Sequence, residues 1–162
     1  MKKWTVALAM ILLLCVLASC SSSNWKVLNA KNFISKAESA KYTIIIEEDY
    51  DDFGTYWAGA HKFAAGVEKI EGKEIYVIDY TRDVSVYNAE IEYLDYVDEV
   101  KQIGGNSNSG SGKNYEFQIN SSATKFGIAL RVEDVNLFVV AGAEYKDEIL
   151  KFFKNVGYEL KV

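Results

Sequence analysis

The stretch YEFQINSSATKFGIALRV, residues 115–132, decides the fold class. Apolar and polar side chains alternate over residues 115–120 and again over residues 125–132. A period of two with one polar face is typical of antiparallel strands that bury only one side. Residues 135–141 follow as a third predicted strand. This part of the chain is therefore predicted to form an antiparallel sheet.

Outward from this stretch, the apolar pattern predicts three more strands and three helices. The strands are expected at 42–48, 61–70 and 73–81. The last two form a hairpin that turns at Glu71 and Gly72. The helices are expected at 30–41, 84–101 and 145–156, where apolar residues recur at helical spacing. Residues 103–113, which are almost free of hydrophobic side chains, are predicted to be a flexible linker.

The predicted class is α+β, with a mainly antiparallel sheet of five to six strands and the helices packed on one face. The order helix, strand, strand, strand occurs twice before the last helix, which suggests an internal duplication. Two segments 116 residues apart share an apolar pattern. Chance periodicity explains that match nearly as well.

Length and composition indicate one globular domain, assigned to residues 29–162. The chain has 162 residues, of which 49% are hydrophobic and 25% charged. Those values exclude a disordered chain and a coiled coil. The formal net charge of −5 disfavours a nucleic-acid partner.

The N-terminus has the features of an export signal. Lys2 and Lys3 precede an apolar run at residues 4–18, which is shorter than a membrane-spanning helix needs. The tetrapeptide Leu17-Ala18-Ser19-Cys20 resembles the lipobox of bacterial lipoproteins. The resemblance implies a signal peptide at 1–19 and a Cys20 that carries lipid, such as palmitate. It also implies a tether at 20–28 that holds the domain on the extracytoplasmic face of the cell membrane.

An uncleaved signal anchor is the alternative, and it places the domain on the same side of the membrane. The body of the chain is similar in style to the small secreted lipoproteins of Gram-positive bacteria, a group that implies no particular activity. After cleavage at Cys20 the domain would contain no further cysteine. A chain of this length can build its core without a disulfide.

The sequence offers no catalytic set and no cofactor motif. His61 is the only histidine, and it is interpreted as a surface or sheet-face residue. Zinc sites need several His or Cys ligands, which this chain lacks. The run Gly110-Ser111-Gly112-Lys113 departs from the phosphate-loop pattern and precedes a predicted strand. We therefore expect no enzyme activity and no cofactor.

The acidic segment at residues 47–54 is the candidate metal site. Asp49, Asp51 and Asp52 cluster there, and Ca²⁺ prefers carboxylate oxygens. The segment is not an EF-hand, because Ala60 stands where the last, bidentate glutamate belongs. The favoured interpretation is a solvated loop, with a looser Ca²⁺ site as the alternative.

The predicted helix at 84–101 is the candidate partner surface. Its apolar arc is far wider than one buried face requires. The favoured interpretation is a helix wedged between the sheet and another helix. The alternative is a tyrosine-lined docking surface, built from Tyr93, Tyr96, Glu92, Asp95 and Glu99.

These observations together predict a membrane-anchored lipoprotein that binds another envelope protein or an envelope component and is not an enzyme. Residues 47–99 carry 15 acidic and four basic residues, which would suit a cationic partner. The alternative function is binding of a small ligand or of Ca²⁺.

Overall fold

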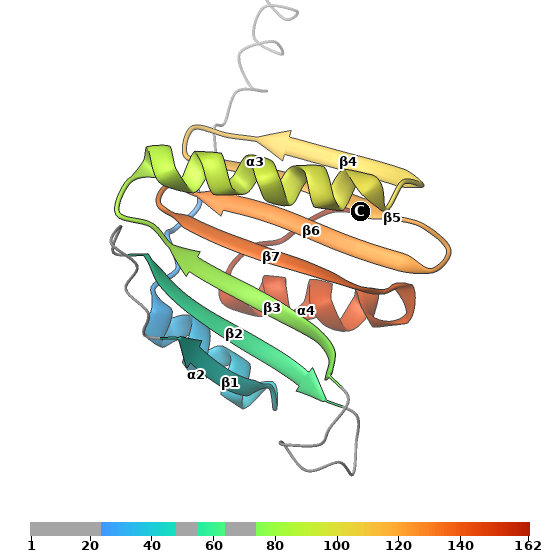
Figure 1. The fold of residues 1–162 in the computed structure, drawn as a ribbon, viewed down its shortest axis with the longest axis horizontal. Helices are drawn as coiled ribbons and strands as arrows, with labels where there is room; N and C mark the ends of the chain where they lie inside the picture. Colours follow the sequence, from blue (N-terminus) through green and yellow to red (C-terminus); the bar gives the residue numbers. More distant parts are fainter. Residues whose placement is uncertain (1–23, 48–54, 64–73) are drawn as a thin grey trace, which may run out of the picture.

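The computed structural model describes residues 24–47, 55–63 and 74–162. This part of the chain forms one seven-stranded sheet with three α-helices (Figure 1). The strands are β1 (Thr43–Glu47), β2 (Tyr56–Phe63), β3 (Glu74–Arg82), β4 (Asn106–Ser111), β5 (Tyr115–Ser121), β6 (Lys125–Val132) and β7 (Val135–Gly142). The helices are α2 (Ala30–Ser39), α3 (Val86–Gln102) and α4 (Lys146–Val156), the last preceded by a short 3-10 turn, η1 (Ala143–Tyr145).

The sheet is antiparallel, with the strand order β1-β2-β3-β7-β6-β5-β4. The α+β class and the antiparallel sheet are therefore confirmed. The alternating segments of the sequence are β5 and β6, and residues 135–141 fall within β7. The first three strands join the other four through the pair β3–β7, in which Thr81 lies opposite Asn136.

The prediction of five to six strands was wrong, because β4 lies inside the predicted linker 103–113. Its residues NSNSGS are polar and largely exposed, yet they pair with β5 in regular register. Strand pairing uses backbone groups, so a segment without hydrophobic side chains can still form an edge strand. Gly104 and Gly105 make the turn from α3 into β4 with positive φ angles of 68° and 73°.

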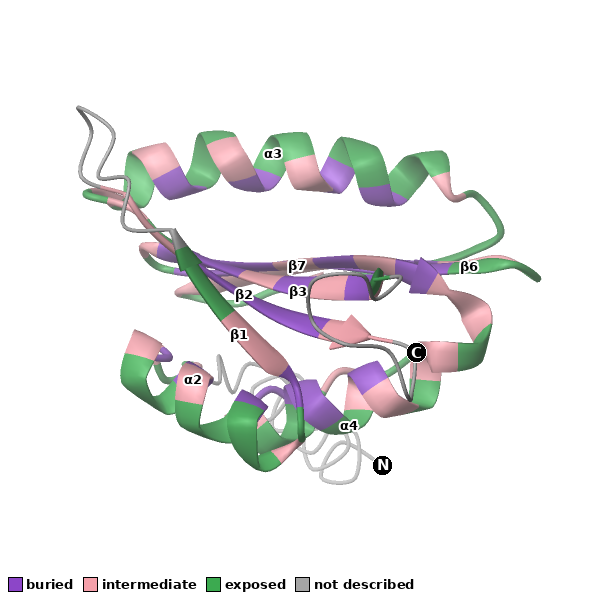
Figure 2. Cartoon of the chain, turned by 60° about the horizontal axis from the view of Figure 1, so that its bottom comes forward, coloured by how far each residue is buried: buried purple, intermediate pink, exposed green. Residues whose placement is uncertain are grey.

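The helices do not all pack on one face, which corrects a second prediction. Helices α2 and α4 cover one face of the sheet, and α3 covers the other (Figure 2). The physical reason lies in β6, where Gly127 and Ala129 present almost no side chain to α3. A Cβ on Gly127 would lie 2.5 Å from Cδ1 of Ile103, so a larger residue there would have to displace the Ile103 side chain.

The suggested duplication does not match this architecture. Three strands follow α2, whereas four follow α3, and the two helices lie on opposite faces of the sheet. Other boundaries shifted as well. Helix α3 begins at Val86 with Ser85 as its N-cap, and β2 occupies 56–63. The predicted turn at Glu71 and Gly72 lies outside the described residues.

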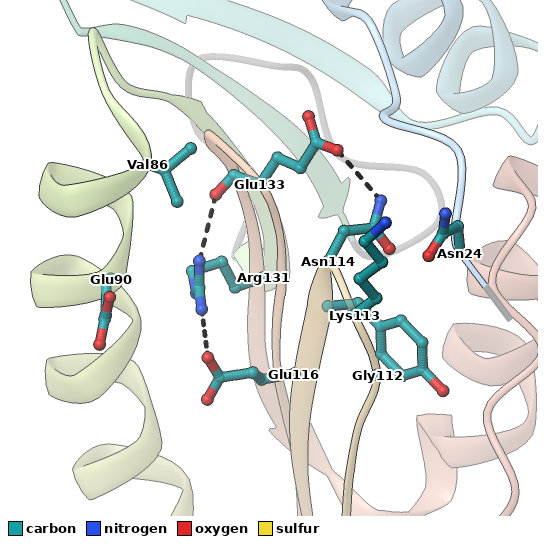
Figure 3. A pocket seen from close by; sticks show the side chains of 10 residues that line it. Asn24, Val86, Glu90, Gly112, Lys113, Asn114, Glu116, Arg131 and Glu133 are labelled. Carbon is teal, nitrogen blue, oxygen red and sulfur yellow. Dashed lines mark hydrogen bonds and ion pairs between the residues drawn. The ribbon is translucent and has the colours of Figure 1, made fainter. Parts of the chain in front are cut away.

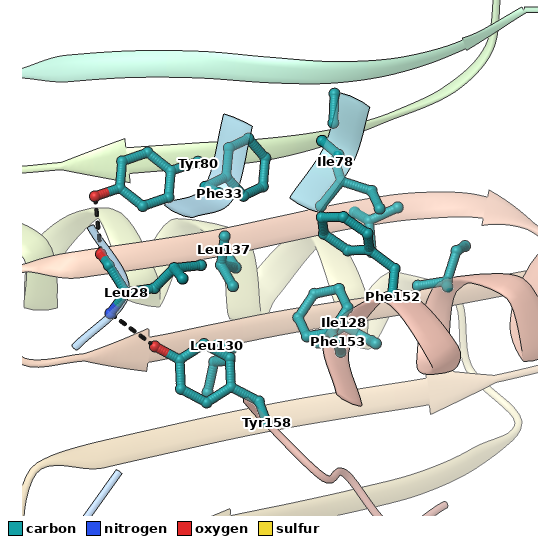
Figure 4. Close-up of a cluster of buried hydrophobic side chains, with 14 of the residues drawn as sticks. Leu28, Phe33, Ile78, Tyr80, Ile128, Leu130, Leu137, Phe152, Phe153 and Tyr158 are labelled. Atoms are coloured by element: carbon teal, nitrogen blue, oxygen red, sulfur yellow. Dashed lines mark hydrogen bonds between the residues drawn. The ribbon is translucent and has the colours of Figure 1, made fainter. Parts of the chain in front are cut away.

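The main core lies between the sheet and the two helices α2 and α4 (Figure 4). Phe33 of α2 stacks on Tyr80 of β3 at 5.0 Å between ring centroids and meets Phe152 of α4 edge-on at 5.8 Å. Both backbone polar groups of Leu28 form hydrogen bonds with tyrosine hydroxyls. Its N–H donates to the Tyr158 hydroxyl at 3.1 Å, and its carbonyl accepts from the Tyr80 hydroxyl at 3.0 Å. These bonds satisfy buried polar groups inside an otherwise apolar core.

Candidate functional site

Helix α3 lies across β5, β6 and β7. Its first turn is capped by Ser85, whose Oγ accepts a 3.1 Å hydrogen bond from the N–H of Asn88. The inner side of the helix is buried and consists of Ala89, Tyr93, Val97 and Val100. Because these residues recur at helical spacing, one narrow face attaches the helix to the sheet.

The opposite side of α3 carries exposed apolar side chains, here called the outer stripe: Val84, Tyr87, Ile91 and Leu94. Their exposed fractions are 59%, 70%, 49% and 54%. Tyr87, Ile91 and Leu94 are spaced by four and three residues, so they lie on one side of the helix, and Val84 immediately precedes the N-cap. A row of exposed apolar side chains on one side of a helix is a feature of interaction surfaces.

Carboxylates flank the outer stripe. Glu90, Asp95, Asp98 and Glu99 are all exposed, and Lys101 in the last turn is the one basic residue of α3. The predicted site residues Asp95 and Glu99 thus lie at the surface, beside the stripe. The outer face of α3 therefore combines an apolar centre with an acidic rim.

The two tyrosines predicted to line a docking surface face the sheet instead. Tyr93 is only 5% exposed and packs with Val97, Val100 and Ala129. Burial raises the pKa of its hydroxyl, and the nearby Glu116 carboxylate raises it further. Tyr93 is inward because β6 offers a small side chain, Ala129, where the ring lies. This residue is therefore part of the packing of α3 and not of its outer face.

Tyr96 and Glu92 lie at the edge of α3, between the helix and the sheet. The Tyr96 ring stacks on Phe138 of β7, with 4.4 Å between ring centroids. Its hydroxyl donates to Glu92 Oε1 at 2.7 Å, and burial raises its pKa. Both residues are half-buried. Tyr87, Ile91 and Leu94 belong to the wide apolar arc of the predicted helix, but the sequence carries no signal for which side of that arc faces the sheet.

A polar cluster joins the first half of α3 to β7 and to the end of β3. Asn136, which is fully buried, donates from Nδ2 to the carbonyl of Ala89 at 3.0 Å and to Glu92 Oε2 at 2.9 Å. Burial, followed by the charge of Glu92, raises the pKa of Asp83 to about 7. Burial raises the pKa of Asp79 to about 6. The attachment of α3 therefore includes acidic groups that titrate near neutral pH.

His61 occupies the sheet face on the same side as α3. Its Nδ1 pairs with the Glu74 carboxylate, and its Nε2 has no hydrogen-bond partner among the described residues. A Cβ on Gly59 would lie 2.5 Å from that Nε2, so glycine makes room for the ring beside Trp57. The single histidine is thus a buried sheet-face residue with one carboxylate partner.

The remaining predicted site residues cannot be placed. Cys20, Asp49, Asp51 and Asp52 lie outside the described residues. Within 24–47, 55–63 and 74–162, no three His, Cys, Asp or Glu side chains are grouped so that they would hold a metal ion.

Among the helices of the described ranges, none is both long enough and apolar enough to span a membrane.

Comparison with protein-family profiles, with curated proteins and with solved structures gave no match to this chain. The function is therefore inferred from the geometry of the site itself.

Proposed function

We propose that this chain is a lipid-anchored extracytoplasmic protein that binds another envelope protein through the outer stripe of α3. The observation that carries the proposal is the exposure of Tyr87, Ile91 and Leu94 on a helix whose other side is already packed. Each of these side chains would contribute roughly 1.5–3 kcal/mol if a partner buried it fully. We propose no enzyme activity and no cofactor.

The acidic rim favours a partner that carries basic side chains. A helix or strand that presents an apolar ridge flanked by Lys or Arg would pair with Glu90, Asp95 and Asp98 while it covers the stripe. A second copy of this chain would bring the same carboxylates together, which disfavours self-association through α3. Anionic lipid would meet the same repulsion. A basic amphipathic protein segment is therefore the proposed occupant.

Residues 25–28, which the predicted tether 20–28 included, pack against the domain, so a tether would extend only over residues 20–24. Trp25 stacks on Tyr115 with 4.0 Å between ring centroids and an interplanar angle of 7°. The Trp25 N–H donates to Asn114 Oδ1 at 3.0 Å, and its carbonyl accepts from Asn114 Nδ2 at 2.8 Å. Trp25 follows Cys20 by five positions, which is at most about 18 Å of extended chain. A lipid on Cys20 would therefore hold the end of the domain that contains Asn114 close to the membrane.

The anchor can be tested separately from the partner. Metabolic labelling with a palmitate analogue should mark the full chain, and the Cys20→Ala variant should lose both the label and the membrane fraction. A chain that stays unlabelled and fractionates with membranes unchanged after Cys20→Ala would contradict lipidation. The apolar run at 4–18 would then act as an uncleaved anchor.

Site-specific photocrosslinking in the producing cells tests the partner surface. A photoreactive residue at Leu94 should crosslink to a discrete protein, whereas the same residue at Lys36 should not, because Lys36 is exposed on α2 on the opposite face. The double change Ile91→Ala and Tyr87→Ala should abolish the Leu94 crosslink. Crosslinks to lipid, or only to a second copy of the chain, would contradict the proposal.

Charge reversal tests the chemistry of the partner. Asp95→Lys with Asp98→Lys should weaken the Leu94 crosslink, since two attractive contacts become repulsive. The matched control is Asp147→Lys, an exposed acid in the first turn of α4. An unchanged crosslink after reversal would show that the partner does not present basic side chains.

A further inference from the structure

A cavity of about 490 Å³ lies where the first turns of α3 overhang the ends of β5 and β6 (Figure 3). This volume lies within the range of small-molecule sites. Its lining comes from both layers: Val86 and Glu90 from α3, Glu116 from β5 and Arg131 from β6. The cavity lies at the end of the sheet, between α3 and the chain at Asn24, and it shares Glu90 with the acidic rim but none of the apolar side chains of the outer stripe.

Arg131 forms the charged floor of this cavity. The residue is only 9% exposed. One Nη pairs with the Glu116 carboxylate, and the other donates a long 3.5 Å bond to the carbonyl of Glu133. Its Nε has no partner among the described residues. A guanidinium has five N–H donors, of which two are paired here. Because Nε is itself buried, a ligand would contact Arg131 through the remaining N–H groups of its two Nη atoms.

Glu133 lies at the mouth of the cavity and has a backbone conformation that is unfavourable for glutamate. It occupies the two-residue turn between β6 and β7 with a positive φ of 56°, which glutamate rarely adopts. Its N–H donates to the Asn114 carbonyl at 3.0 Å, and its Oε1 accepts from Asn114 Nδ2 at 3.2 Å. These contacts, with the bond from Arg131, hold a carboxylate at a position where glycine or asparagine would be less strained.

The lining presents both signs of charge. Lys113 and Arg131 contribute two cations, and Glu90, Glu116 and Glu133 contribute three carboxylates. Because Glu116 already neutralises Arg131, a ligand with only a negative charge would meet Glu90 and Glu133 without compensation. A ligand with only a positive charge would meet Lys113 and the spare donors of Arg131. A compact ligand that carries both charges would satisfy the two sets together.

We propose that this cavity binds a small zwitterion, in which a carboxylate or phosphate contacts Arg131 and Lys113 while an ammonium contacts Glu90 and Glu133. Two sources share this chemistry: a free amino acid or short peptide, and the phosphoethanolamine headgroup of a lipid. The site goes beyond the proposed partner surface and does not depend on it.

Calorimetric titration of the full chain in detergent micelles tests the proposal. The probes are the twenty common amino acids, the dipeptide Ala-Ala, and glycerophosphoethanolamine. At least one should bind with a stoichiometry of one. The best amino-acid or dipeptide probe is then compared with its N-acetyl and amide analogues, in which one of the two terminal charges is removed. Each analogue should bind at least about 10-fold more weakly, since it loses a charge-assisted contact. Preference for glycerophosphoethanolamine would identify a headgroup, and preference for an amino acid or Ala-Ala would identify a free solute.

Substitutions of two exposed residues at the mouth of the cavity, Lys113 and Glu133, keep the test independent of folding. Lys113→Gln and Glu133→Asn should each weaken binding about 10-fold, because each removes one charge that the zwitterion requires. Asparagine tolerates the positive φ of this position, so Glu133→Asn should keep the thermal midpoint of the wild type. Lys125→Gln, at the far end of β6, is the matched control. Leu94→Ala should leave zwitterion binding unchanged even if it abolishes partner crosslinking.

Three results would overturn the proposal. The first is no binding by any zwitterion of the panel at millimolar concentration. The second is equal affinity for singly charged analogues, which would show that the two signs of charge do not act together. The third is zwitterion binding by Lys113→Gln and Glu133→Asn that is as tight as binding by the Lys125→Gln control.

Discussion

The two faces of the sheet differ in what they bury. The face covered by α2 and α4 buries an apolar, aromatic-rich cluster of 22 residues, whereas the cluster under α3 has four buried members. Strand register places the six buried polar residues of the described ranges on the α3 face: His61, Thr81, Gln118, Asn120, Arg131 and Asn136. The face under α2 and α4 therefore supplies most of the apolar burial, and the face under α3 carries the buried polar groups.

This division has a consequence for function. Apolar burial is non-directional and scales with area, so the face with α2 and α4 accounts for most of the driving force of folding. The α3 face depends on fewer apolar contacts and on directional hydrogen bonds, such as those of Asn136. A layer held in this way can carry an exposed apolar stripe and a charged cavity without weakening the main core.

The largest expected effect tests which face stabilises the fold. Phe152→Ala should lower the free energy of unfolding by about 3–5 kcal/mol, because Phe152 is 2% exposed and contacts three other aromatic rings. Val97→Ala, under α3, should cost only about 1–2 kcal/mol. Urea unfolding of both variants measures the difference. Equal losses would mean that α3 is as important to stability as α2 and α4.

The second prediction concerns pH and the polar attachment of α3. Asp83 has a pKa of about 7 in the folded chain, above its ordinary value in an unfolded chain. The folded state therefore binds this proton more tightly, and stability should rise as the pH falls through 7 and decline as the pH rises through it. Because Asp83 is half-buried and partly screened by solvent, the gain between pH 8 and pH 5 should be about 1–2 kcal/mol.

The variant Asp83→Asn isolates this contribution. It should remove that part of the pH dependence. Urea midpoints of the wild type and the variant at pH 5 and pH 8 give the comparison. If the two proteins show the same difference between the two pH values, Asp83 does not titrate in this range.

The sequence predicted the strands of the stabilising face better than it predicted the α3 layer. Apolar residues such as Phe126, Ile128 and Leu130 recur with period two, so β6 and its buried face follow from the pattern. Gly127 and Ala129 carry no such signal, because small side chains occur both in solvent and under a closely packed helix. The position of α3 on the second face therefore could not be predicted.

The same limit applies to the candidate site. The wide apolar arc of α3 was visible in the sequence, but its division into inner and outer sides depends on where Ala129 admits the Tyr93 ring. Strand β4 was missed because its pairing depends on backbone groups and on the register with β5. The cavity beside Arg131 joins residues from four separate segments, a juxtaposition that only the fold supplies.

A smaller effect tests how closely α3 approaches the sheet. Gly127→Ala should destabilise the protein by about 1 kcal/mol, at the low end for overpacking, because the added Cβ meets the flexible end of Ile103. Gly104→Ala is a useful contrast. The added Cβ there would meet no atom within 4 Å, so its cost would come from the positive φ alone. If Gly127→Ala has no effect on the thermal midpoint, the helix end is not held closely against β6.

The smallest expected effect is the most informative about the outer stripe. Tyr87→Ala, Ile91→Ala and Leu94→Ala should each change the free energy of unfolding by less than about 0.5 kcal/mol, as surface substitutions usually do. Tyr93→Ala, on the inner side of the same helix, should cost several-fold more because that ring is 5% exposed. A loss of stability at the stripe as large as that at Tyr93 would mean that this chain already uses these side chains for its own packing. A stripe that contributes little to stability, yet decides whether the Leu94 crosslink forms, would identify its apolar residues as serving the partner.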